Sequence, residues 1–153
     1  MLLVIVAASA SRAQTTEVTR DCASVPQQDH ALRYSIEGRN HSTDLSLEIS
    51  LTPAMFNEPD LVRLSCQLQK EFPKENVIHA LIFDDKQAAR NLALYHTDQP
   101  NHAIYLWHVR ARYELDRGKG SQYVEFLYPE AQDDLIILKR IKIRIPLSAT
   151  SKP

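Results

Sequence analysis

The sequence predicts an α+β domain of two layers, with helices packed on one face of a mostly antiparallel mixed sheet. Three observations lead to this prediction: strand-like alternation near both ends of residues 31–147, one long run with helical periodicity, and a nearly continuous apolar strand. With 153 residues, 44% of them hydrophobic, the chain is long enough for a single domain with its own core. We expect the element order β-β-α-β-α-β-β-β, with the helices covering the apolar face of the sheet.

Residues 1–13 predict a signal peptide. A short apolar run at 2–8 precedes small residues, and Ser11 and Ala13 stand at the −3 and −1 positions of a cleavage site before Gln14. We therefore expect an exported protein, secreted or periplasmic, with no transmembrane segment after cleavage. The alternative for this run is a buried N-terminal strand.

Residues 14–30 are polar and irregular, and they predict an N-terminal arm. The arm contains Cys22, while Cys66 falls on a predicted helix. An even number of cysteines in an exported chain allows one disulfide, and we expect Cys22 and Cys66 to form it and so to fix the arm to the folded body. The alternative leaves Cys22 free and Cys66 on the apolar face of the helix.

The first half of the domain predicts a hairpin, a helix and a strand. Residues 32–37 and 45–51 alternate between apolar and polar, and the turn at 38–44 holds a glycosylation sequon at Asn40. Apolar residues then recur at helical spacing up to Pro73, with Asn57 as the N-cap and Pro59 in the first turn. The apolar run at 76–83 indicates a central strand covered on both faces, so the helix should form a right-handed crossover between the second and third strands.

The second half predicts a short helix and an antiparallel meander. Residues 86–95 suit the helix, and a loop follows at 96–102. Three strands, two turns and a tail complete the chain: strands at 103–116, 121–128 and 135–145, turns at 117–120 and 129–134, and a tail at 148–153. Pairing through the first turn sets Glu125 opposite Arg112.

Two aspartates, Asp84 and Asp85, stand between the apolar strand and the short helix. Our interpretation is that both are structural: one caps the helix and the other is its solvated neighbour. The alternative is a small metal-dependent hydrolase, because carboxylate and imidazole groups bind divalent ions. Its ligands would be Asp84, Asp85, His96, Asp98 and His102, although their spacing matches no metal motif.

Basic residues gather on the outward face of the meander. Alternation places five of them there: Arg110, Arg112, Arg140, Lys142 and Arg144. They form a candidate site for phosphate, sulfate or an acidic glycan. The alternative is a solvated face, since Glu114 and Glu125 fall on it too and basic residues also guard sheets against edge pairing. The net charge of −1 predicts no nucleic-acid partner.

The sequence does not present an assembled catalytic site. His79 interrupts the apolar strand, and we expect a buried histidine held by one hydrogen bond rather than a catalytic base. No nucleophile stands in a familiar catalytic sequence, and three glycines leave no glycine-rich phosphate loop. We therefore expect no cofactor, and a non-catalytic binding or interaction module whose partner is an anionic ligand or an envelope protein. The alternatives are the hydrolase and a structural component of the cell envelope.

Overall fold

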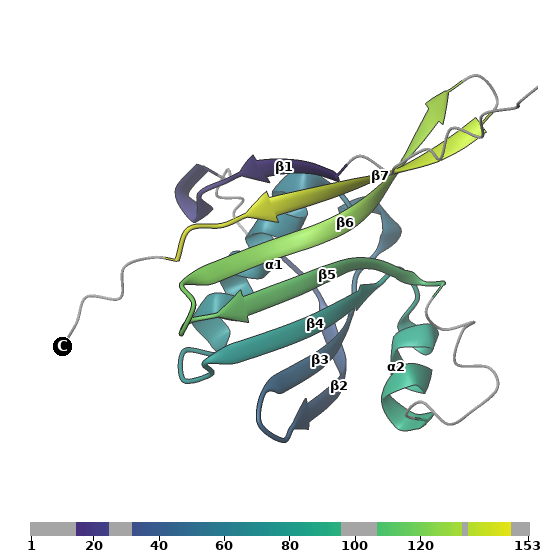
Figure 1. The fold of residues 1–153 in the computed structure, drawn as a ribbon. Helices are drawn as coiled ribbons and strands as arrows, with labels where there is room; N and C mark the ends of the chain where they lie inside the picture. Colours follow the sequence, from purple (N-terminus) through teal and green to yellow (C-terminus); the bar gives the residue numbers. More distant parts are fainter. Residues whose placement is uncertain (1–14, 25–31, 96–106, 133–134, 148–153) are drawn as a thin grey trace, which may run out of the picture.

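The structure is a computed structural model that describes residues 15–24, 32–95, 107–132 and 135–147 (Figure 1). These residues form one seven-stranded sheet with the order β1-β7-β6-β5-β4-β3-β2. Neighbouring strands are antiparallel except for the parallel pairs β1–β7 and β3–β4. The elements are β1 (Thr15–Thr19), η1 (Cys22–Ser24), β2 (Ser35–His41), β3 (Leu45–Ser50), η2 (Pro53–Met55), α1 (Glu58–Glu71), β4 (Val77–Phe83), α2 (Lys86–Tyr95), β5 (Val109–Asp116), β6 (Ser121–Gln132) and β7 (Leu135–Arg144).

The mixed sheet and the helices agree with the predicted α+β class, but the chain forms one strand more than predicted. β1 lies in the segment that the sequence predicts to be an irregular arm, and it pairs in parallel with residues 140–144 of β7. Its sequence, TTEVT, contains a single apolar residue, Val18, which packs against the core. A short edge strand with one inward residue carries too little alternation to be recognised from sequence.

The helix α1 begins where the sequence predicts. Asn57 Oδ1 accepts a hydrogen bond from the Asp60 N–H at 3.0 Å, and Pro59 occupies the first turn, where its missing N–H costs nothing. α1 lies behind the strands in Figure 1 and covers what we call the inner face of the sheet. The core there includes fully buried side chains from α1, β3, β4 and β5: Leu61, Leu64, Leu68, Leu47, Ile49, Ile82, Tyr113 and Leu115. Each contributes about 1.5–3 kcal/mol through burial.

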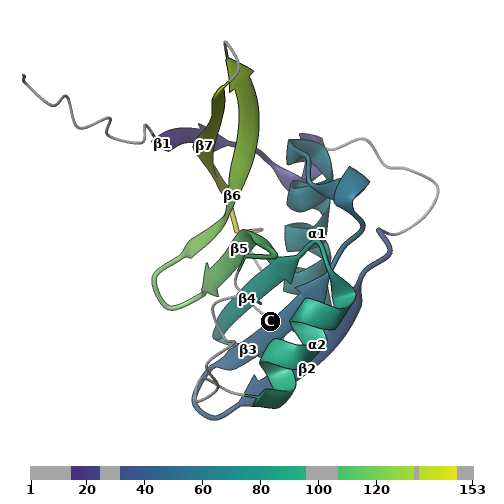
Figure 2. The same ribbon diagram turned by 90° about the vertical axis from the view of Figure 1, so that its right-hand side faces the viewer.

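The helix α2 does not share the inner face with α1, which corrects the prediction that both helices pack on one side. Leu81 packs against Ala88, Ala89 and Leu92 of α2, whereas its neighbour Ile82 belongs to the core under α1. Successive residues of a strand point to opposite faces, so α2 lies on the other side of the sheet, which we call the outer face. Figure 2 shows α2 alongside β2 and β3. Consecutive apolar residues in β4 require this cover on both faces.

The turn of the first hairpin is shorter than predicted, because β2 runs on to His41 and only residues 42–44 connect it to β3. A bulge between Ile36 and Gly38 inserts Glu37 without a partner on β3. Gly38 is needed for the approach of α2, since a Cβ atom there would lie 2.3 Å from the Cβ of Ala93. Asn40 of the sequon therefore lies on an exposed strand rather than in a turn.

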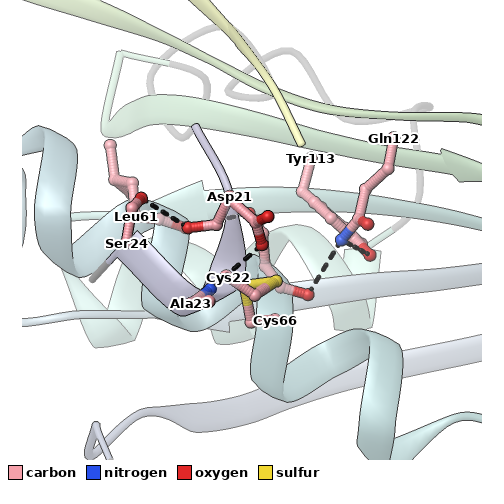
Figure 3. Close-up of a disulfide and its surroundings, with 9 residues drawn as sticks. Asp21, Cys22, Ala23, Ser24, Leu61, Cys66, Tyr113 and Gln122 are labelled. Atoms are coloured by element: carbon pink, nitrogen blue, oxygen red, sulfur yellow. Dashed lines mark hydrogen bonds between the residues drawn. A yellow bond between two sulfur atoms is a disulfide. The ribbon is translucent and has the colours of Figure 1, made fainter. Parts of the chain in front are cut away.

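The disulfide between Cys22 and Cys66 is present, as the sequence predicts (Figure 3). The Cα atoms are 5.9 Å apart, and the bond joins η1 to α1 across a sequence separation of 44 residues. Nearby, the buried Gln122 side chain donates hydrogen bonds to the Ser65 carbonyl at 3.1 Å and to the Tyr113 hydroxyl at 3.2 Å. This corner of the molecule is thus held by a covalent bond and by a polar link between the sheet and α1.

The last two strands reach beyond the sheet. β6 and β7 extend through most of the turn predicted at 129–134, and only residues 133–134 separate them. From Leu127 onward, β7 is the only described strand that pairs with β6, and this part of the hairpin projects from the body of the molecule (Figures 1 and 2). At the other end, β5 begins at Val109, and Trp107 just before it is exposed. Residues 103–106 of the strand predicted at 103–116 lie outside the described residues.

Candidate functional site

Asp85 is the N-cap of α2. Its Oδ1 accepts a hydrogen bond from the Ala88 N–H at 2.6 Å, and its carbonyl oxygen accepts one from the Ala89 N–H at 3.2 Å. These bonds satisfy N–H groups of the first helical turn, and the carboxylate lies at the positive end of the helix dipole. The capping role that the sequence predicts for one of the two aspartates is confirmed.

Asp84 is not the solvated neighbour that the sequence predicts. Its side chain is only 17% exposed, and it binds His108 Nδ1 through Oδ1 at 2.9 Å and Arg110 Nε through Oδ2. These bonds join the end of β4 to the start of β5. Asp84 and Asp85 therefore serve different partners, and Arg110 is not available as an unpaired cation of the predicted anion site.

The remaining members of the proposed metal site, His96, Asp98 and His102, lie outside the described residues. Within the residues that the structure does describe, no group of three or more His, Cys, Asp or Glu side chains is arranged to hold a metal ion. His108 bonds to Asp84 through Nδ1. Among the described residues, no hydroxyl or thiol group bonds to its Nε2. The metal-dependent hydrolase remains an untested prediction.

The outer face beyond α2 is polar and open. Two rows of residues cross it in register from β3 to β7: Ser46, His79, Glu114, Tyr123 and Arg144 in one, and Glu48, Leu81, Arg112, Glu125 and Lys142 in the other. The predicted pairing of Arg112 with Glu125 in the register of β5 and β6 is confirmed. Among the described residues, α2 packs mainly against β2, β3 and β4, so it leaves the parts of both rows on β5, β6 and β7 uncovered.

Four of the five predicted anion-binding residues already have partners. Arg110 binds Asp84, Arg140 Nε lies 3.5 Å from Glu125 Oε1, and Arg144 binds Glu17. The Lys142 ammonium lies 3.9 Å from the ring centroid of Tyr123, a cation–π contact. Arg112 differs from the others: it is exposed, and it has no hydrogen bond or ion pair with another described residue.

Arg112 also occupies a special position on this face. Together with Glu125 it lines two neighbouring open depressions of about 380 and 230 Å³. The larger one extends over β3 and β4 and includes His79, Glu114 and Tyr123, and the smaller one includes Arg140. Arg112 therefore lies where a ligand in either depression would contact it.

No family model matches the chain, and no curated protein or solved structure is significantly similar to it. None of the helices in the described residues is long and apolar enough to cross a membrane. The functional argument therefore depends on the chemistry of the outer face.

His79 is exposed, which corrects the prediction of a buried histidine. Its side chain is 48% exposed; Nδ1 lies 3.3 Å from Glu114 Oε1, and Nε2 lies 3.8 Å from Asp44 Oδ2. The apolar residues of β4 point alternately to the inner and the outer face of the sheet. On the outer face, α2 covers the end of β4 at Leu81 and Phe83. His79 lies nearer the other end, where nothing in the described residues covers it.

The pKa values of two side chains of β5, Tyr113 and Asp116, are shifted. Burial raises the pKa of the Tyr113 phenol, so this group stays neutral. Hydrogen bonds from Lys119 lower the pKa of the partly exposed Asp116 carboxyl at the end of β5. Both shifts follow from the fold and hold these groups in their ordinary charge states at neutral pH.

A buried carboxylate, Glu37, was not identified from the sequence, where it reads as one of the polar residues of a hairpin strand. Its side chain is 4% exposed and lies 3.4 Å from Lys86 Nζ, 3.1 Å from Arg90 Nη2 and 3.3 Å from Ser50 Oγ. Glu37 thus fixes α2 to the bulge in β2. A sequence signal did exist, because Lys86 and Arg90 are spaced to lie on one side of the helix.

Proposed function

We propose that the protein is an exported, non-catalytic binding module that takes an anionic ligand on the outer face around Arg112. The observation that carries the proposal is the position of Arg112: an exposed guanidinium between two depressions, without a partner among the described residues. Guanidinium groups bind carboxylate, sulfate and phosphate groups through two parallel hydrogen bonds. The Cys22–Cys66 disulfide supports export, because such bonds persist in oxidising compartments.

The surroundings of Arg112 favour an acidic carbohydrate within this class of ligands. Carboxylates of Glu114 and Glu125 line the same depression, and they would repel a ligand that carries only negative charge. They would, however, accept hydrogen bonds from sugar hydroxyl groups, and the Tyr123 ring offers an apolar surface beside them. A sugar with one sulfate or carboxylate group matches both the guanidinium and the acceptors.

The proposal is tested by titrating the purified protein with a sulfated oligosaccharide, with its desulfated form and with inorganic sulfate. We expect NMR shift changes that gather on residues of β4, β5 and β6, and binding that needs the sulfate group. Arg112→Gln should weaken binding at least about tenfold, which corresponds to the loss of one charge-assisted pair. Arg33→Gln is the matched control, since it removes the same charge from another exposed arginine.

Equal binding by the wild type and Arg112→Gln would contradict the proposed site. Binding that falls equally in Arg112→Gln and Arg33→Gln would indicate a general charge effect rather than a site. The structural-envelope alternative gains support if no small anion or acidic sugar binds at millimolar concentration.

A further inference from the structure

Among the described residues, no strand other than β6 and β7 pairs with the projecting end of the β6–β7 hairpin. We call it the distal ribbon, and it consists of residues 127–132 of β6 and 135–139 of β7. β5 pairs with β6 only up to Phe126, and β1 pairs with β7 only from Arg140 onward. A two-stranded ribbon by itself is marginally stable in water, so a third strand beside it would be strongly stabilising.

The backbone hydrogen bonds of β7 show which groups face its free edge. The Arg144 carbonyl accepts a bond from the Arg20 N–H at 2.9 Å and so points toward β1, whereas the Ile145 N–H donates to the Gln122 carbonyl at 2.9 Å and points toward β6. Directions alternate along a strand, and the β6–β7 register has no shift. Ile136 and Leu138 therefore direct their N–H and C=O groups to the free edge of β7.

The two free edges of the distal ribbon differ in how well they are protected against pairing with a further strand. Pro129 lies opposite Leu138, at a position where the missing N–H would have pointed away from β7. It therefore removes a donor from the free edge of β6, as prolines at sheet edges commonly do. Along the free edge of β7 the sequence is Leu-Ile-Ile-Leu at 135–138, with neither a proline nor a charge. The β6 edge is guarded and the β7 edge is open.

We propose that a second copy of this chain pairs with the free edge of β7, in an antiparallel arrangement with a two-fold axis at Ile137. In this register Ile136 of each copy exchanges its backbone hydrogen bonds with Leu138 of the other, because both residues direct their polar groups to this edge. The overlap covers the whole of residues 135–139. A two-fold contact of this kind closes on itself, so the product is a dimer and not a fibre.

Charge complementarity supports a second copy in this register. Residues 133–134 of the chain are both Asp, and residues 139–140 are Lys and Arg. Antiparallel pairing about Ile137 places Leu135 of each copy, which directly follows the acidic pair in the sequence, opposite Lys139 of the other copy. Parallel pairing would instead place like charges side by side, which destabilises neighbouring strands.

The first test measures the association state by sedimentation equilibrium of the purified, disulfide-bonded protein. Five residues of strand from each copy make a small interface, so we expect a weak monomer–dimer equilibrium that is visible between about 10 μM and 1 mM. Ile136→Pro removes an N–H from the open edge and should abolish dimers over this range. Ala131→Pro is the matched control, because Ala131 lies opposite Ile136 but on the guarded edge, and it should dimerise like the wild type.

The second test does not depend on a proline being tolerated. Ile137→Cys places two thiols at the two-fold axis, where Cα atoms of a non-hydrogen-bonded pair are about 4.5 Å apart, a separation that a disulfide spans. Mild oxidation should give covalent dimers of Ile137→Cys much faster than of Glu130→Cys, whose residue lies opposite Ile137 on β6. A wild type that stays monomeric, open-ended aggregation, or equal crosslinking of the two cysteine variants would each overturn the proposal.

Discussion

On the inner face of the sheet, α1 and the strands enclose one continuous apolar core, whereas on the outer face α2 packs mainly against β2, β3 and β4. The inner face is aliphatic and aromatic, with Ile78, Leu115 and Ile143 fully buried. The outer face carries two rows that each mix acidic and basic side chains, several of which form ion pairs. The same strands build both faces, since successive residues point to opposite sides. The inner face therefore determines stability, and the outer face is free to vary for binding.

The disulfide gives the largest expected effect, because it fixes η1 and β1 to the inner face of the sheet. Closing a loop of this length contributes about 4 kcal/mol on the chain-entropy estimate. We expect the Cys22→Ser/Cys66→Ser double variant to lose about this much unfolding free energy in urea denaturation. A loss below about 1 kcal/mol would show that the N-terminal segment is already fixed by the β1–β7 pairing.

A pair of adjacent substitutions in β5 compares the two faces directly. Leu115→Ala creates a cavity on the inner face and should cost about 2–5 kcal/mol of unfolding free energy. Glu114→Ala removes a half-buried carboxylate from the outer face and should change it by less than about 1 kcal/mol. Thermal and urea unfolding of the two variants provide the measurement. Similar losses for both would mean that the outer face also carries the fold.

The features of the inner face could be predicted from the sequence better than the elements that cover or flank the sheet. The inner-face residues repeat at the spacing of a strand or a helix, so the α1 cap at Asn57, the meander and the Arg112–Glu125 register were predicted correctly. The strand β1 was missed because one apolar residue makes no pattern. Periodicity indicates which residues share a face, but it does not indicate which element covers that face. The prediction that α2 packs on the same face as α1 was therefore wrong.

The candidate site was harder to predict than the fold for a related reason. Basic residues of the outer face could be placed by alternation, but their partners are far from them in the sequence, such as Asp84 for Arg110 and Glu17 for Arg144. Only these long-range pairings single out Arg112. His79 was assigned to the core because an apolar run does not show where the covering helix ends. Glu37 lies at a bulge in β2 that no local sequence feature marks, and the spacing of Lys86 and Arg90 on α2 was the one sequence signal for its burial.

The Glu37 cluster tests whether α2 is held on the outer face mainly by charge. Glu37→Gln keeps the shape but removes the negative charge beside Lys86 and Arg90, and we expect a loss of about 1–2 kcal/mol. Lys86 and Arg90 are half exposed, so Arg90→Gln should cost less, about 0.5 kcal/mol. Hydrogen exchange of α2 amides should accelerate in Glu37→Gln more than exchange in α1. Equal acceleration in both helices would show that the sheet, rather than α2 alone, depends on this cluster.

The smallest expected effect concerns the cap of α2, and it separates a structural aspartate from a metal ligand. Asp85 accepts the Ala88 N–H, and serine at an N-cap does the same, so Asp85→Ser should change the unfolding free energy by only a few tenths of a kcal/mol. Asp85→Ala leaves that N–H without its acceptor and should cost about 1 kcal/mol. A metal ligand behaves differently, because serine lacks the charge that binds the ion. Elemental analysis of the wild type and of Asp85→Ser completes the measurement. Near-stoichiometric zinc or manganese in the wild type, lost in a folded Asp85→Ser protein, would contradict the capping role and favour the hydrolase.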